Sequence, residues 1–162
     1  MARVAASAEP LPVNYLAKII IVINNNVNIS RFNGAVPTSQ NQQRKIFDGP
    51  LYEKGAVLLL SEAQQLTVWS KGAICDSKKW DLSTDEIAHL VTLALVQGAF
   101  IDSEWCQPRT DGPWPACDSY RVTRLEWILA AHKEMRTSYF LKFAISRTGN
   151  TLLIASNHPE GA

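Results

Sequence analysis

The segment from Ser83 to Ile101 is apolar on almost every side of a predicted helix. Ser83 and Glu86 have capping-box spacing, in which each side chain accepts a backbone N–H of the other's turn, so the helix begins here. At about 100° per residue the apolar side chains form one broad face and continue around both sides. The polar strip that remains is narrow: Asp85, Glu86, His89, Thr92 and Gln97. We therefore expect this helix at the centre of the domain.

The length of 162 residues suits one domain with its own core. We expect a flexible N-terminal arm over residues 1–14, one α+β domain over 15–158 and a tail over 159–162. No run approaches the roughly 20 apolar residues of a membrane span, and no signal-peptide core follows the first residues. Three cysteines cannot pair completely within one chain. These features predict a cytoplasmic protein with reduced thiols and no membrane contact.

The remaining periodicity predicts a mixed or antiparallel sheet, a buried central helix and a second amphipathic helix packed on one face. The strands are expected in a hairpin over 15–32, in a short run over 56–60, and in a hairpin over 139–156 that turns at Gly149 and Asn150. Two further capping boxes predict helices over 61–69 and 123–136, although the end of the first also fits a strand.

The segment from Asp102 to Ser119 is rich in proline and tryptophan, which predicts a long loop. Loops of this length are either functional or packed on themselves. Trp105 and Trp114 are its expected anchors, on the chain's own core in preference to a partner.

Charge is segmented although the net charge is only +1. Residues 24–47 carry three basic side chains and no acid, residues 81–111 carry six acids against one base, and residues 121–147 carry six bases against two acids. Oppositely charged segments can pair within one chain or between copies. The small net charge disfavours nucleic acid as the main partner, although the basic segments are compatible with it.

Candidate binding residues lie in three places. The basic loop contributes Arg44 and Lys45, the proline-rich loop contributes Trp105 and Trp114, and the outer face of the predicted 123–136 helix carries Trp127 with Arg121 and Arg124. Tryptophan and arginine are enriched at interaction hot spots. A tryptophan lying flat over a neighbouring loop explains Trp127 equally well.

Catalytic motifs are missing from the sequence: it has no phosphate-binding glycine loop, nucleophile elbow or zinc helix. No cysteine pair has the spacing of a zinc site, so neither metal nor cofactor is expected. The best enzyme alternative is a thiol hydrolase in which His132 or His89 activates Cys106 or Cys117, with Asp118 or Glu126 orienting the base. A metal-free nuclease or transferase using His89, Glu86 and nearby arginines is a further alternative.

The sequence thus favours a non-enzymatic protein that binds a macromolecule or assembles with itself. A structural protein fits, as does an accessory protein of a virus or mobile element. The expected partner is another protein or further copies of the chain.

Overall fold

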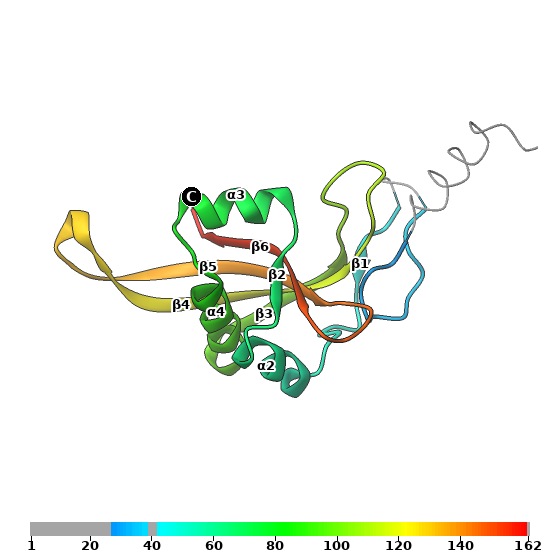
Figure 1. Ribbon diagram of the computed structural model, residues 1–162, viewed down its shortest axis with the longest axis horizontal. Coiled ribbons are helices and arrows are strands. Elements are labelled where there is room, and N and C mark those ends of the chain that lie inside the picture. The colour runs from blue at the N-terminus through cyan, green and yellow to red at the C-terminus, as the bar shows by residue number, and fades with distance from the viewer. Residues whose placement is uncertain (1–26, 39–41, 162) are drawn as a thin grey trace, which may run out of the picture.

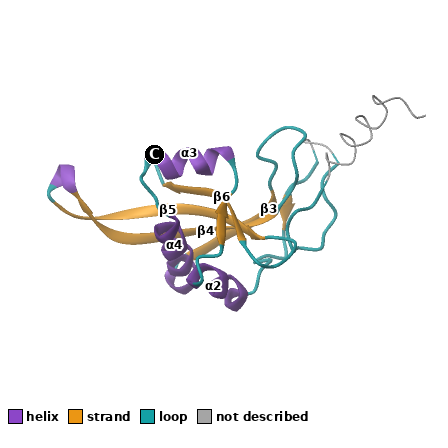
Figure 2. Ribbon diagram, in the orientation of Figure 1, coloured by secondary structure: helices purple, strands orange, loops and turns teal. Residues whose placement is uncertain are grey.

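The computed structural model describes residues 27–38 and 42–161, which form a six-stranded mixed sheet with helices packed on it (Figure 1). The predicted α+β fold is confirmed. Figure 2 shows α3 alongside β6, α2 and α4 together on the other side of β6, and most of the loops gathered at one end. The elements in chain order are β1 (Lys45–Ile46), α2 (Lys54–Glu62), β2 (Leu66–Val68), α3 (Lys71–Lys79), α4 (Thr84–Gln97), β3 (Ala99–Trp105), β4 (Ala116–Ile128), the 3-10 turn η1 (Leu129–Ala131), β5 (Lys133–Ile145) and β6 (Leu152–Pro159).

The sheet has the order β1-β3-β4-β5-β6-β2, and its central pairs are antiparallel. At one edge β2 pairs with β6 in the parallel sense. Among the described residues, no helix combines the length and the apolar composition that crossing a bilayer requires.

The buried central helix is α4, as the sequence predicts. The Ser83 Oγ accepts the Glu86 backbone N–H at 3.2 Å, and Ile87 and Leu90 are fully buried. The helix ends earlier than expected, because residues 99–101 begin β3. Gly98 permits this exit, since a Cβ there would lie only 2.6 Å from the Arg121 carbonyl oxygen of β4.

The predicted helix over 123–136 is wrong: this segment forms the outer parts of β4 and β5 and the turn between them. The capping-box residues have other partners, because the Thr123 hydroxyl bonds the Ser138 hydroxyl at 2.6 Å and Glu126 accepts from Tyr139. Within the segment, residues 124–127 alternate polar and apolar side chains with the period of a strand. The pairing of β4 with β5 selects the strand over the helix.

The predicted strand over 56–60 and helix over 61–69 are also wrong. Residues 56–60 belong to α2, and residues 66–68 form β2. Ser61 does not cap a helix, because its hydroxyl lies within α2 and donates to the Leu58 carbonyl oxygen at 3.0 Å. The strand over 15–23 lies outside the described residues, and the following segment forms only isolated bridges at Asn28 and Ser30.

The C-terminal hairpin is confirmed, with both strands longer than predicted. Gly149 occupies its turn with φ 79°, a conformation that glycine adopts without strain. The loop over 102–119 is shorter than predicted, because Asp102–Trp105 and Ala116–Ser119 are paired strand residues. The loop itself covers residues 106–115.

Asp118 on β4 fixes the chain segment before α2 to the sheet. Its buried carboxylate accepts the Leu51 N–H at 3.0 Å, the Tyr52 N–H at 3.2 Å and the Ser103 hydroxyl at 2.6 Å. Burial raises the pKa of Asp118, and these three donors oppose that rise. The Tyr52 hydroxyl donates to the Ala116 carbonyl oxygen at 2.5 Å, so backbone and side chain of this segment are both held.

Replacing Asp118 with alanine should lower the free energy of unfolding by about 3 kcal/mol or more, because three buried donors lose their acceptor. Urea unfolding measures the change. Asp102→Ala is the matched control, since Asp102 forms only a partly exposed ion pair with Lys45 at 3.5 Å and should cost about 1 kcal/mol or less. Equal losses in the two variants would contradict the anchoring role.

Candidate functional site

The outer part of the β4–β5 hairpin projects beyond the rest of the sheet (Figure 1). Toward the outer end of the hairpin, the pairing of β4 with β3 stops at Arg121, which lies opposite Ala99. The pairing of β5 with β6 stops at Tyr139, which lies opposite Pro159. Residues 123–138, here called the projecting ribbon, pair with each other as strands and close through η1, and at the base of the ribbon the Ser138 carbonyl oxygen also accepts the Glu160 N–H at 2.8 Å. At about 3.3 Å per residue, the six pairs extend roughly 20 Å.

Large apolar side chains are exposed on the projecting ribbon. Leu125 and Trp127 are each 61% exposed, Leu129 in the turn is 74% exposed and Met135 is 41% exposed. Because strand residues alternate between faces, Leu125 and Trp127 share one face, and Met135, opposite Glu126, lies on the other. The ribbon therefore offers apolar surface on both faces and at its tip.

Sequence analysis identified Trp127 but not Leu125, Leu129 or Met135 as candidates. In a helix, Leu125, Leu129 and Met135 fall on the buried face, so their exposure follows from the correction to a strand. The alternation of polar and apolar residues from Arg124 to Trp127 is the sequence signal that would have placed Leu125 on the face of Trp127, and no comparable signal marks Leu129 or Met135.

The base of the projecting ribbon is anchored to α4 by charged groups. The Arg124 Nε donates to the Glu126 carboxylate at 2.5 Å, the Tyr139 hydroxyl donates to the same oxygen at 2.6 Å, and the Arg124 Nη2 lies 3.5 Å from Glu86 of α4. The Arg124 guanidinium also stacks 5.1 Å from the Tyr139 ring centre. These contacts fix the direction in which the ribbon leaves the body.

Burial and the bond to Glu126 raise the pKa of Tyr139 to about 12. Burial alone acts to raise the pKa of Glu126, but the Tyr139 hydroxyl and the Arg124 guanidinium outweigh it and lower that pKa. Glu126 is therefore ionised in the folded protein over a wider pH range than a free side chain. Its charge holds Arg124 and Tyr139 together.

The three predicted contact residues of this region do not share one face. Arg121 and Trp127 lie on the same face of β4, and Arg124 lies on the opposite face, toward α4. The Arg121 guanidinium pairs with Glu160 at 2.6 Å. Arg124 is thus a structural anchor, and Trp127 is the most exposed of the three.

The other predicted binding residues gather at the opposite end of the sheet. The Arg44 guanidinium lies 5.0 Å from the Trp114 ring centre. The backbone carbonyl oxygen of Arg44 accepts the Trp105 N–H at 2.9 Å. Trp105 and Trp114 form a second core cluster with Ala116. Only 5% of Trp105 and 1% of Trp114 is exposed, so the chain's own core surrounds both rings.

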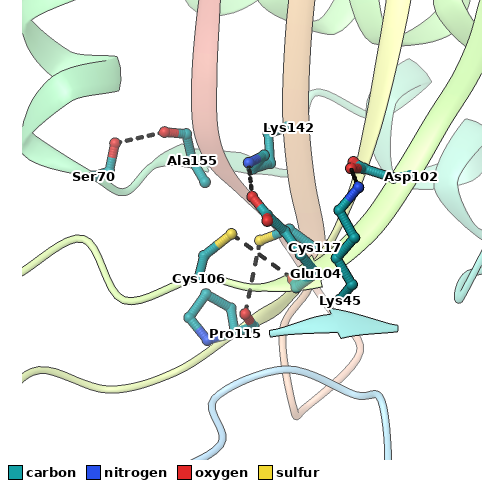
Figure 3. A network of polar contacts seen from close by, with 9 residues as sticks. All are labelled: Lys45, Ser70, Asp102, Glu104, Cys106, Pro115, Cys117, Lys142 and Ala155. Carbon is teal, nitrogen blue, oxygen red and sulfur yellow. Dashed lines mark hydrogen bonds and ion pairs between the residues drawn. The ribbon is translucent and has the colours of Figure 1, made fainter. Parts of the chain in front are cut away.

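Beside this cluster lies a polar cavity of about 280 Å³, part of which is drawn in Figure 3. Four charged or nucleophilic residues line it. Arg44 precedes β1, Glu104 lies in β3, Cys106 follows β3, and Lys142 lies in β5. The Lys142 ammonium bonds the Glu104 carboxylate. Burial acts to lower the pKa of Lys142, but the nearby thiols and Glu104 outweigh it, so that the pKa is raised.

The two thiol candidates lie together here, and the histidine candidates lie elsewhere. Cys106 and Cys117 are side-chain neighbours, both close to Lys142. His132 ends the turn at the tip of the projecting ribbon, and the length of β4 separates it from Cys117 by roughly 36 Å. His89 is exposed on α4, which lies on the other face of the sheet. Thiol catalysis stays a prediction, for which the described residues supply no imidazole at either sulfur.

Metal-binding groups do not converge: no three histidine, cysteine or carboxylate side chains of residues 27–38 and 42–161 form a potential metal site.

Comparison with known proteins gives no match: no protein-family model, no curated protein and no solved structure is similar to the chain. The projecting ribbon and the polar cavity are therefore the features from which a function can be inferred.

Glu126→Gln should remove part of the pH dependence of stability. Because the folded-state pKa of Glu126 is lowered, its contribution is complete above the unfolded pKa of about 4.3 and is lost as the pH falls toward the folded value. The stability difference between wild type and Glu126→Gln should therefore shrink between about pH 6 and pH 3, measured by urea unfolding. Glu134→Gln is the matched control on the same ribbon, and the same shrinkage in both variants would contradict the account.

Proposed function

We propose that the protein is a non-enzymatic binding protein that assembles with itself, using the projecting ribbon to contact a second copy of the chain. The observation that carries this proposal is the exposure of Leu125, Trp127, Leu129 and Met135 on a two-stranded extension that contacts α4 at its base.

The need for a partner follows from the physics of isolated hairpins. A two-stranded ribbon alone in water is at best marginally stable. Both edges of this ribbon also present backbone N–H and C=O groups that no neighbouring strand of the described residues pairs. A surface that covers the ribbon stabilises it through apolar burial and through pairing of these edges.

The charges of the ribbon favour a protein surface over a polyanion. Arg124, Lys133 and Arg136 are offset by Glu126 and Glu134, so the two signs are interspersed along it. A phosphate backbone requires a clear excess of positive charge. With a net charge of +1, two copies also approach each other with little repulsion.

The chain itself carries apolar surface that can receive the ribbon. Val96 at the end of α4 is 62% exposed, and Phe100 and Ile101 at the start of β3 are 38% and 41% exposed. Within β3, β1 pairs only with Ser103 and Glu104, so Phe100 and Ile101 are not covered by this pairing. A second copy thus supplies both halves of the contact.

Replacing both Trp127 and Leu129 with alanine should weaken self-association by about 30-fold or more, because exposed aromatic and apolar anchors carry much of an interface's energy. Size-exclusion chromatography with light scattering across a concentration series measures the association. Leu59→Ala is the matched control: Leu59 lies on α2 and is 71% exposed, close to the 74% of Leu129. Wild-type protein that stays monomeric at every concentration, or an equal effect of Leu59→Ala, would refute the proposal.

The charges of the ribbon disfavour nucleic acid as its partner, and binding measurements at different salt concentrations test this. We expect short single-stranded and duplex nucleic acids to bind no more tightly than the non-specific range of about 0.1 mM to 1 µM at physiological salt. Fluorescence anisotropy at two salt concentrations measures this. Tight, strongly salt-dependent binding that Trp127→Ala abolishes would replace the second copy with nucleic acid as the ribbon's partner.

A further inference from the structure

Cys106 and Cys117 face each other across the end of the β3–β4 ladder. Glu104 pairs with Cys117, and the Cys106 N–H donates to the Pro115 carbonyl oxygen at 2.9 Å, so the two cysteines are diagonal neighbours on one face of the sheet. Figure 3 shows the two sulfur atoms directed toward one another. Each thiol donates to a backbone carbonyl oxygen at this end of the ladder, Cys106 to Glu104 at 3.8 Å and Cys117 to Pro115 at 3.9 Å.

Access to the two sulfurs differs. Cys117 is fully buried, whereas Cys106 is partly exposed and lines the polar cavity. A small reagent that enters the cavity therefore reaches Cys106 first and has Cys117 directly behind it. Cys75, by contrast, is an exposed residue of α3.

Charges around the pair distinguish the two thiols further. Burial raises the pKa of the Cys117 thiol, and Cys106 and Asp118 add to that rise, so Cys117 is held as a protonated thiol. The Lys142 ammonium lies close to both sulfurs and bonds Glu104. It therefore places a positive charge beside the sulfur that the cavity exposes, where it can stabilise the negative charge of the departing hydroxide.

We propose that Cys106 and Cys117 are a redox-active dithiol that a small hydroperoxide entering the polar cavity oxidises to an intramolecular disulfide. This site is independent of the projecting ribbon and does not rest on self-association. Lys142 acts as a positioning residue through its charge.

The reaction has two steps. The Cys106 thiolate attacks one oxygen of hydrogen peroxide, the O–O bond breaks, and the departing hydroxide takes up a proton as water, which leaves a sulfenic acid on Cys106. The Cys117 sulfur then attacks the Cys106 sulfur, the S–O bond breaks, and the released hydroxide leaves as water with the Cys117 proton. Overall the two thiols lose two electrons, and one peroxide is reduced to two waters.

Peptide mapping of the intact, folded chain tests this directly. Arg109 lies between the two cysteines, so trypsin places them in separate peptides, residues 80–109 and 110–121. After hydrogen peroxide treatment and alkylation of the remaining thiols, we expect these peptides to be joined and lighter by two hydrogen atoms than their sum. Dithiothreitol should separate them again.

Three variants separate the roles. Cys75→Ser should leave the joined peptides unchanged. Cys117→Ser should let the Cys106 sulfenic acid accumulate, so that dimedone labels it at least several-fold more than in wild type. Lys142→Met should slow Cys106 oxidation by about threefold to tenfold and Lys142→Arg, which keeps the charge, should restore most of the rate, whereas Lys45→Met, at an exposed lysine, should leave the rate unchanged.

Either of two results would overturn the proposal. One is recovery of Cys106 and Cys117 as separately alkylated peptides after peroxide has oxidised Cys75. The other is a disulfide that joins Cys106 or Cys117 to a second chain. Both are read from the wild-type protein, so neither depends on whether a variant folds.

Discussion

The ladder between β4 and β5 runs in unbroken register from Asp118, opposite Phe143, to Ile128, opposite Lys133. Its inner part has β3 on one side, β6 on the other and α4 across one face. Its outer part, among the described residues, has neither β3 nor β6 paired beside it and contacts α4 through Arg124 at its base. The same two strands therefore form the middle of the sheet and extend beyond it as the projecting ribbon. The position of the ribbon is fixed by the inner part of the ladder, which packs against β3, β6 and α4.

At the inner end of the β4–β5 ladder, next to the proline-rich loop, neighbouring residues of β4 point to opposite faces of the sheet. Asp118 points to one face and holds the segment before α2, while Cys117 points to the other face beside Cys106. Trp105 and Trp114 are both buried at this end. The loop thus presents one thiol to a cavity, and the tryptophans at and beside it, Trp114 and Trp105, serve the fold.

Local signals predicted the parts of the fold that local interactions determine. Ser83 and the apolar run after it specify α4, and Gly149 specifies the turn of the C-terminal hairpin. The projecting ribbon could not be recognised in this way, because Thr123 and Glu126 have capping-box spacing and the apolar residues fit a helix as well as a strand. Pairing with β5, which is not local in sequence, decides the outcome.

The same non-local pairing explains which site residues the sequence found. Trp127 is exposed in either conformation, so its assignment as a contact residue survives the change from helix to strand. Arg124 moves to the opposite face, because a strand alternates where a helix turns by 100°. The Cys106–Cys117 pair could not be found from spacing, since only the register of β3 with β4 brings the two side chains together.

Hydrogen–deuterium exchange of the projecting ribbon at two protein concentrations tests the central claim most directly. If the ribbon is covered by a second copy, the amides of residues 123–138 exchange slowly at high concentration and faster by an order of magnitude or more on dilution, while the inner ladder stays protected at both. Identical exchange of the ribbon at the two concentrations, with the inner ladder intact, would contradict the account.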